Sequence, residues 1–206
     1  MRTGLFGGTF DPIHNGHLQV VQSAKWLLNL DRVIFIPAGD PPHKTDKVIT
    51  DKFTRLDMAQ LAANIVGAQV SDWEVRQEKK SYSLDMLRHF RSVYPQDELF
   101  FIVGADSFRD LPLWWHYREL LELCTFVVVA RPDVDKETLL DRFVGDEKPP
   151  RVFYLEDVPM DISSTEIRQM AGSGQDVSHL VPPAVLTFIK THSLYINGGD
   201  NGFRKN

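Results

Sequence analysis

The chain has 206 residues but only one cysteine, Cys124, and no apolar run long enough to cross a bilayer. A single cysteine excludes an internal disulfide, and no group of cysteines and histidines has zinc-site spacing. A membrane-spanning helix needs about 20 predominantly apolar residues, and Met1-Arg2-Thr3 does not begin a signal peptide. Because Cys124 opens the apolar run 124–130, we expect a buried thiol in a cytoplasmic protein.

Positive charge is also scarce. Lysine and arginine number 23 against 28 acidic residues, which gives a formal net charge of −5. Without a basic excess or a long basic run, nonspecific binding to nucleic acid is not expected, nor is binding to a membrane. The length fits one domain. We predict that this domain spans 1–196 and that the glycine-containing segment Asn197–Asn206 is a flexible tail.

Short apolar runs alternate with amphipathic segments along the whole chain. The predicted strands are Arg2–Phe6, Arg32–Pro37, Gln69–Val75, Glu98–Val103, Thr125–Ala130 and Arg151–Leu155. The predicted helices span residues 17–29, 52–65, 83–94, 115–122, 135–143, 164–171 and 182–191. This alternation predicts the α/β class, as a single-domain, Rossmann-like, doubly wound parallel sheet with helices on both faces. Ligands of such sheets bind beyond the C-terminal ends of the strands.

Neither the P-loop lysine motif nor a G-x-G-x-x-G sequence is present. The first predicted strand leads instead into Gly7-Gly8-Thr9-Phe10-Asp11-Pro12-Ile13-His14-Asn15-Gly16-His17, before apolar residues at helical spacing. A glycine-rich turn that enters a helix favours phosphate, because the first amides and the helix dipole attract anions. His14 and His17, three residues apart, can face one phosphate. The competing interpretation is a structural turn with hydrogen-bonded histidines.

A second motif, Ile162-Ser163-Ser164-Thr165-Glu166-Ile167-Arg168, lies near the other end of the chain. Ser163 and Glu166 have the spacing of a capping box, which by itself indicates only the start of a helix. The same helix start together with the Arg168 guanidinium can also bind phosphate oxygens through charge-assisted hydrogen bonds.

With G-G-T-F-D-P-x-H-x-G-H at one end and I-S-S-T-x-I-R at the other, the chain resembles the H-x-G-H nucleotidyltransferases. Members of this superfamily join a nucleoside triphosphate to a second phosphate-bearing molecule and release pyrophosphate. Pro41-Pro42-His43-Lys44, Ser81-Tyr82-Ser83-Leu84-Asp85 and Leu113-Trp114-Trp115-His116-Tyr117 narrow this resemblance. With them, the chain from Gly4 to about Tyr195 resembles the bacterial nicotinate-nucleotide adenylyltransferases. The resemblance implies transfer of AMP from ATP to nicotinate mononucleotide in NAD biosynthesis. Mg²⁺ is expected to arrive with ATP, without a metal site built by the protein.

The resemblance also implies roles for individual residues. His14, His17, Lys44 and Arg168 are expected at the triphosphate, with His17 nearest the α-phosphate. The expected ATP-binding residues are Gly7, Gly8, Thr9, Phe10, Gly16, Gly104, Asp106, Ile162, Ser163, Ser164 and Thr165. The expected nicotinate mononucleotide pocket consists of Ser81, Tyr82, Ser83, Trp114 and Trp115.

Several of these residues have ordinary structural alternatives. Lys44 belongs to Asp40–Thr50, which we expect to be a mobile loop, and most lysines of such loops are simply solvated. Asp106 can cap a helix, and paired tryptophans are more often core or interface residues than ligand platforms. Which tryptophan stacks on a pyridine ring stays open.

Other functions also stay open at this point. The substrate could be nicotinamide mononucleotide, phosphopantetheine or FMN, or the triphosphate could be CTP. A noncatalytic nucleotide sensor is the alternative of a different class, although intact His14, His17, Lys44 and Arg168 argue against it. The aromatic content permits a homodimer without requiring one.

Overall fold

The computed structural model describes residues 1–39, 49–78, 82–129, 136–146, 148–156, 158 and 162–196. Most of the predicted loop Asp40–Thr50 and all of the predicted tail therefore lie outside the described residues. The strands are β1 (Arg2–Gly8), β2 (Arg32–Pro37), β3 (Gln69–Val70), β4 (Glu98–Gly104), β5 (Thr125–Val129) and β6 (Val152–Leu155). The α-helices are α1 (Asn15–Leu27), α2 (Lys52–Val66), α3 (Ser83–Val93), α4 (Ala105–Arg109), α5 (Tyr117–Leu123), α6 (Lys136–Asp141), α7 (Ser164–Gly172) and α8 (Pro183–Thr191), and a 3₁₀ turn, η1, spans Leu111–Leu113.

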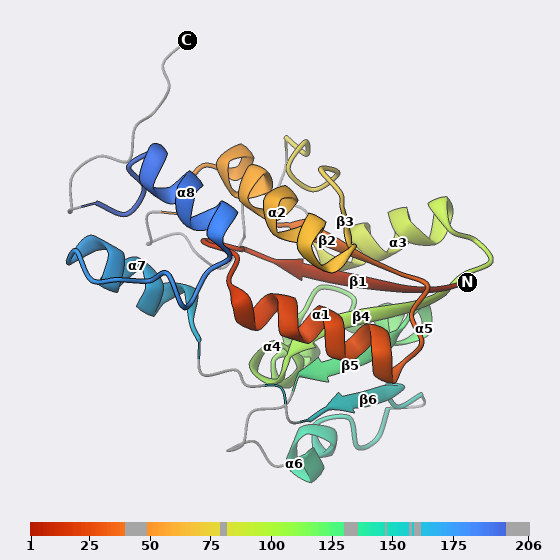
Figure 1. Ribbon diagram of the computed structural model, residues 1–206. Coiled ribbons are helices and arrows are strands. Elements are labelled where there is room, and N and C mark those ends of the chain that lie inside the picture. The colour runs from red at the N-terminus through yellow and green to blue at the C-terminus, as the bar shows by residue number, and fades with distance from the viewer. Residues whose placement is uncertain are drawn as a thin grey trace.

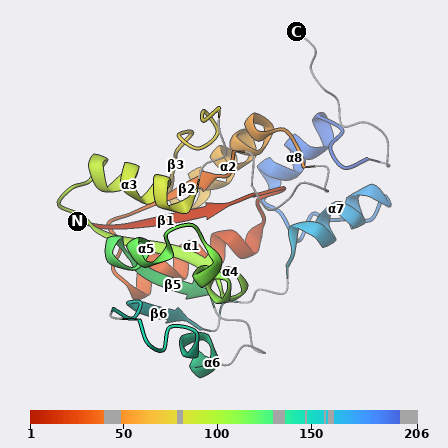
Figure 2. The same ribbon diagram turned by 180° about the vertical axis from the view of Figure 1, so that it is seen from behind.

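The six strands form one sheet in the order β3-β2-β1-β4-β5-β6. Every neighbouring pair is parallel. Helices α1, α2 and α8 cover one face (Figure 1), and α3, α4 and α5 cover the other (Figure 2). The predicted fold class is confirmed. The strand order reverses its direction between β1 and β4, and the C-terminal ends of these two strands are where a doubly wound sheet binds its ligand.

Helices cover both faces of the central strands (Figure 1 and Figure 2). Because successive side chains of a strand point to opposite faces, the side chains on both faces become buried. Phe6 packs on the side of α1 and α2, whereas its neighbour Leu5 packs on the side of α3 and α5. In β4, Phe100 packs on the same side as Phe6, and Phe101 packs on the same side as Leu5. This double burial explains why the strands read as continuous apolar runs in the sequence. Cys124 is 1% exposed as predicted, and burial raises the pKa of its thiol to about 12.

Two predicted elements differ from the structure, and two short elements of the structure were not predicted. The strand predicted over Gln69–Val75 ends at Val70, because the chain turns at residues 73–76 and the Arg76 amide donates to the Asp72 carbonyl. The helix predicted to begin at 115 begins at Tyr117, since His116 adopts a left-handed conformation. Helix α4 and the turn η1 were not predicted. The remaining elements agree to within a few residues, although Ala130, the predicted last residue of its strand, lies outside the described residues.

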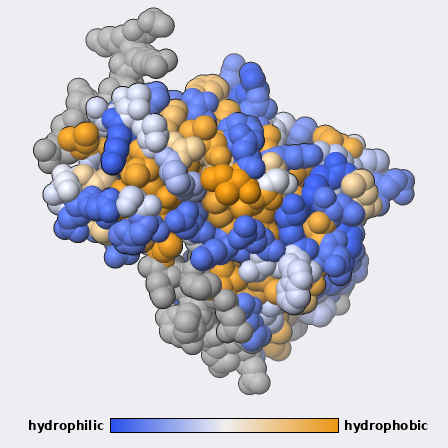
Figure 3. All heavy atoms as spheres, viewed as in Figure 1, coloured by the Kyte–Doolittle hydropathy of each residue, from blue (hydrophilic) through white to orange (hydrophobic). Residues whose placement is uncertain are grey.

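None of the described helices is both long enough and apolar enough to cross a membrane. Figure 3 shows hydrophobic and hydrophilic residues interspersed over the face that carries α1, α2 and α8. The large exposed apolar side chains of α1 and α2 are Trp26, Leu27, Phe53 and Ile65. Trp26 is the most exposed of these, at 78%.

Candidate active site

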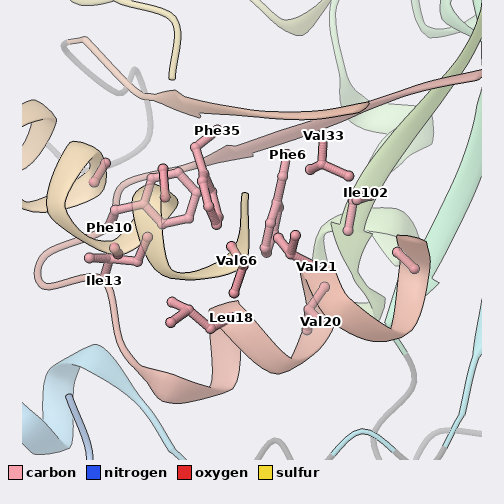
Figure 4. Packing of buried hydrophobic residues seen from close by; sticks show 14 of the residues in the cluster. Phe6, Phe10, Ile13, Leu18, Val20, Val21, Val33, Phe35, Val66 and Ile102 are labelled. Carbon is pink, nitrogen blue, oxygen red and sulfur yellow. The ribbon is translucent and has the colours of Figure 1, made fainter. Parts of the chain in front are cut away.

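The turn after β1 is fixed by two glycines and a buried phenylalanine. Gly7 and Gly8 still pair with β2, and a Cβ atom on Gly8 would lie 2.8 Å from the Phe10 ring. Phe10 has a φ of 51°, and its ring packs edge-on against Phe6 and Phe35 (Figure 4). Because a non-glycine residue in this region is strained, the aromatic packing helps to hold Phe10 in this conformation.

His14 and His17 lie together where α1 begins. His14 is the N-cap, and its ring stacks on that of His17 with centroids 3.7 Å apart. The His14 backbone N–H donates to Nδ1 of His17 over 3.1 Å. This bond needs a lone pair on Nδ1, so the neutral His17 ring carries its proton on Nε2. His17 can therefore donate a hydrogen bond from Nε2 to an incoming phosphate oxygen.

Both histidines are uncharged at neutral pH. Burial lowers the pKa of His14, which is 3% exposed, to about 4. Burial, and secondarily the nearby charge of His14, holds the pKa of His17 well below its ordinary value. Nδ1 of His14 is buried without a hydrogen-bond partner in the described structure. Of His14, His17 and Arg168, only Arg168 therefore carries a positive charge at neutral pH. The two histidines offer neutral donors.

The two sequence motifs meet, although they are separated by about 150 residues of chain. The Ser164 hydroxyl donates to the Pro12 carbonyl over 2.9 Å, and Nη1 of Arg168 donates to the Asp11 carbonyl over 2.7 Å. Ser163 also acts as the predicted N-cap, because its Oγ accepts from the Glu166 amide over 3.1 Å. The start of α7, with Ser164 and Thr165, thus lies against the turn that precedes α1.

Asp11 and Tyr195 form a buried pair beneath these motifs. Asp11 is 3% exposed; its Oδ1 accepts from the Tyr195 hydroxyl over 2.8 Å and its Oδ2 from the Thr50 amide over 3.2 Å. Burial, followed by the charge of Asp11, raises the pKa of the Tyr195 phenol. Asp11 stands inside the quoted motif but was not predicted as a site residue. Nothing in the local pattern around Tyr195 marks its partner.

We expect Tyr195→Phe to lower the free energy of unfolding by about 1–3 kcal/mol, because it leaves a buried carboxylate oxygen without its donor. Urea unfolding at pH 7.5 measures this loss. Tyr117→Phe is the matched control: its half-buried hydroxyl also contacts a carboxylate, but Asp146 keeps Arg118 as a second partner. Equal losses in the two variants would contradict the prediction.

A cavity of about 440 Å³ opens at the ends of β1 and β4. Gly7 and Gly8 of β1 line it together with Val103 and Gly104 of β4. The predicted pocket residues that also line it are Tyr82, Ser83, Trp114 and Trp115. Lining residues that the sequence did not indicate include Ala38, Glu74, Phe101, Ser107 and Leu113. The cavity is thus enclosed by strand ends on one side and aromatic rings on the other.

The two tryptophans present different surfaces to this cavity. Trp114 is half-buried against Phe101, with ring centroids 6.4 Å apart. Trp115 is 46% exposed and lies 5.3 Å from the Tyr82 ring. Either indole offers an aromatic face to a flat ring in the cavity, so the geometry keeps both as candidates.

The remaining predicted residues fall into three groups. Thr9, Phe10, Gly16 and Ile162 belong to the motif segments that meet near His14, where a Cβ on Gly16 would lie 3.1 Å from the His14 ring. Asp106, on α4, makes an ion pair with Arg109 over 3.1 Å. Lys44 and Ser81 lie outside the described residues.

This arrangement suits the binding and transfer of a phosphate group. It combines neutral imidazole donors, a guanidinium and two helix starts. Within the described ranges, no three His, Cys, Asp or Glu side chains come together as metal ligands. Hydrogen-bond donors of this kind can position a phosphate group and stabilise charge that develops on it.

Known proteins similar to this chain are described as enzymes that transfer a nucleotide group. The Cytidylyltransferase-like family matches residues 5–170. A protein of Clostridium novyi (strain NT), described as a probable nicotinate-nucleotide adenylyltransferase, is 42% identical over 197 residues, covering 94% of this chain and 98% of its own length. A protein of Citrifermentans bemidjiense with the same description is 41% identical over 214 residues, covering 96% and 99%.

Solved structures share the fold. The nicotinic acid mononucleotide adenylyltransferase of Plasmodium falciparum, complexed with NaAD, superposes with a TM-score of 0.77 at 20% identity, covering 94% of this chain and 97% of that chain. The same enzyme complexed with APC gives a TM-score of 0.73 at 18% identity, covering 94% and 96%.

Proposed function

The chain belongs to the nicotinate-nucleotide adenylyltransferase family, and we propose that it transfers AMP from ATP to nicotinate mononucleotide in NAD biosynthesis. The products are deamido-NAD and pyrophosphate. The observation that carries this proposal is the meeting of the His14–His17 helix start with the Ser164–Arg168 helix start, close to an aromatic-lined cavity at the strand ends.

The reaction is an in-line displacement at the α-phosphorus of ATP. An oxygen of the mononucleotide 5′-phosphate forms a bond to this phosphorus, and the bond to the β-phosphate oxygen breaks and releases pyrophosphate. The attacking phosphate is already an anion at neutral pH, so the protein needs no general base. A reaction without a general base agrees with a site in which the neutral His14 and His17 lie near the guanidinium of Arg168.

Each side chain has a distinct task in this scheme. His17 donates from Nε2 to the α-phosphate as negative charge shifts toward the leaving group. His14 assists at the same phosphates, and Arg168 carries β- and γ-phosphate charge with two or more donors. Lys44 shares that task by family resemblance. Family resemblance likewise assigns Gly104 and Asp106 to the surroundings of the adenosine of ATP.

Mg²⁺ belongs to this proposal as the partner of ATP. Phosphate oxygens and water would provide most of the ligands of the ion in such a site, so the protein itself need not supply a metal site. When bound with ATP, the ion neutralises charge on the triphosphate.

We also propose that the enzyme works in the cytoplasm.

Pyrophosphate release with Mg²⁺ and ATP tests the proposal, comparing nicotinate mononucleotide with nicotinamide mononucleotide at equal concentration. We expect a strong preference for the acid. Preference for the amide would keep the reaction type and change the substrate. Activity only with phosphopantetheine, with FMN, or with CTP in place of ATP would assign another member of the superfamily. A stable ATP complex that releases no pyrophosphate with any acceptor would identify a nucleotide sensor.

A homodimer is the remaining part of the proposal. The exposed Trp26 and Leu27 at the end of α1 provide an apolar surface for self-association. Sedimentation equilibrium of the wild type and of Trp26→Ser tests this role. A wild type that stays monomeric at high concentration would refute it.

A further inference from the structure

Arg55, in the second turn of α2, is an almost completely buried guanidinium with an exposed fraction of 1%. Its three nitrogens donate to three backbone carbonyls. Nε donates to Thr50 over 2.9 Å, Nη1 to Thr9 over 2.7 Å and Nη2 to Gly39 over 2.8 Å. One planar side chain therefore joins three separate backbone segments.

These three segments surround the site. Thr9 belongs to the turn after β1, and Gly39 lies just beyond the end of β2. Thr50 precedes α2, and its N–H donates to Asp11. Gly39 has no room for a side chain, because a Cβ atom would lie 2.6 Å from the Glu74 carbonyl oxygen. Arg55 donates to the Thr50 carbonyl, and Asp11 accepts from the Thr50 N–H, so both backbone polar groups of Thr50 are held.

Filling the core does not require a guanidinium at this position. Burying a cation carries a large desolvation cost, and apolar replacements of buried charged groups are often neutral or stabilising. What an apolar side chain cannot do is fix the direction of three carbonyl groups at once. The planar fork of arginine has the geometry for this, and the single ammonium of lysine does not.

The bond to Thr9 has a direct consequence for the phosphate-binding turn. In a trans peptide, the carbonyl of one residue and the N–H of the next point in opposite directions. Because the Thr9 carbonyl points toward Arg55, the Phe10 N–H points away from it. Phe10 is also the residue held at a φ of 51°. Arg55 thus orients the Thr9–Phe10 peptide, which lies in the turn between β1 and the H-x-G-H helix.

We propose that Arg55 is a positioning residue for adenylyl transfer, which acts through the carbonyls of Thr9 and Gly39 rather than on the substrate. This inference rests on the proposed function. Arg55 is not among the described residues that line the cavity. Its effect is exerted through backbone groups, and displacement of such groups by about 1 Å is enough to cost about 10²-fold in rate.

The first test compares Arg55→Lys with Arg91→Lys by steady-state kinetics and thermal unfolding. Arg91 is a matched control because it also donates to two carbonyls, of Asp97 and Leu123, but at the opposite edge of the sheet. We expect Arg55→Lys to fold and to lose at least about 30-fold in kcat, with KM for ATP changed by less than about threefold. Arg91→Lys should keep its turnover.

The second test uses Arg55→Ala with guanidinium chloride at low millimolar concentration. A guanidinium ion that enters the vacated space restores the three hydrogen bonds, so we expect it to raise kcat at least about fivefold. A merely destabilised variant would show no rescue, because guanidinium weakens folded proteins and never stabilises them. The same concentration of ammonium chloride should give no rescue, since ammonium lacks the planar fork.

These measurements separate the possible failures. If Arg55→Lys and Arg91→Lys turn over equally, or if guanidinium fails to rescue a folded Arg55→Ala, the positioning role is overturned. It is also overturned if neither Arg55 variant folds, because Arg55 then serves the fold alone. If the wild type and Arg91→Lys transfer no AMP to any mononucleotide, the proposed function fails, and the positioning role fails with it.

Discussion

His17→Ala should lower kcat for pyrophosphate release by at least about 10²–10³-fold while the protein stays folded. The reason is the fixed Nε2–H donor. The backbone N–H of His14 occupies Nδ1 of His17, so the ring presents its proton at Nε2 before substrate arrives. An alanine removes that donor. Single-turnover measurements with saturating MgATP and nicotinate mononucleotide isolate the transfer step from substrate binding.

His192→Ala is the control for this experiment. His192 also stacks on an aromatic ring, that of Phe188, and is a histidine at a helix end, but it is exposed and belongs to neither motif. Its removal should leave turnover within a factor of about two, as surface substitutions usually do. Near-normal turnover of a folded His17→Ala protein would refute the role of His17 at the α-phosphate.

Acid should destabilise the ligand-free protein more than its carboxylates alone explain. An unfolded histidine has a pKa near 6.5, whereas His14 in the folded chain titrates at about 4. Between these values the unfolded chain holds a proton that the folded chain lacks, so stability falls as pH falls. The stabilisation is fully present above 6.5. We expect His14 to contribute a loss of about 2 kcal/mol between pH 7.5 and pH 5, with His17 acting in the same direction.

Urea unfolding of the wild type and of His14→Asn, at a series of pH values from 7.5 to 5, measures this contribution. The asparagine keeps a polar group near the position of Nδ1 but does not titrate. The curve of free energy against pH should be flatter for the variant by about 2 kcal/mol over this range. Parallel curves would show that His14 does not titrate at a lowered pKa in the folded state.

The fold and the two motifs could be predicted from the sequence because both leave local patterns. The alternation of apolar runs with helical segments predicted the α/β class, and the glycine-rich turn before a helix indicated where β1 ends. That the two motifs meet in one site follows from the rule that such a sheet binds its ligands beyond the C-terminal ends of the strands.

The supporting contacts could not be predicted in this way. Arg55 meets Thr9 across 46 residues of sequence, and its helix gives no sign of a buried guanidinium. Tyr195 meets Asp11 across 184 residues. Such pairs are determined by how helices pack onto the sheet, which hydrophobic periodicity does not specify. The short α4 and η1 were missed for a related reason, because Gly104 and Pro112 read as turn residues when only their neighbours are considered.

The bond between Tyr195 and Asp11 also constrains when an enzyme of this kind can become active during its synthesis. At roughly 5–20 residues per second, a ribosome takes about 10–40 s to make the stretch of chain that separates these two residues. The nascent polypeptide carries its H-x-G-H turn well before the phenol that pairs with the buried carboxylate has been made. A message truncated before Tyr195 would yield a chain with every predicted phosphate-binding residue and an Asp11 carboxylate without that donor.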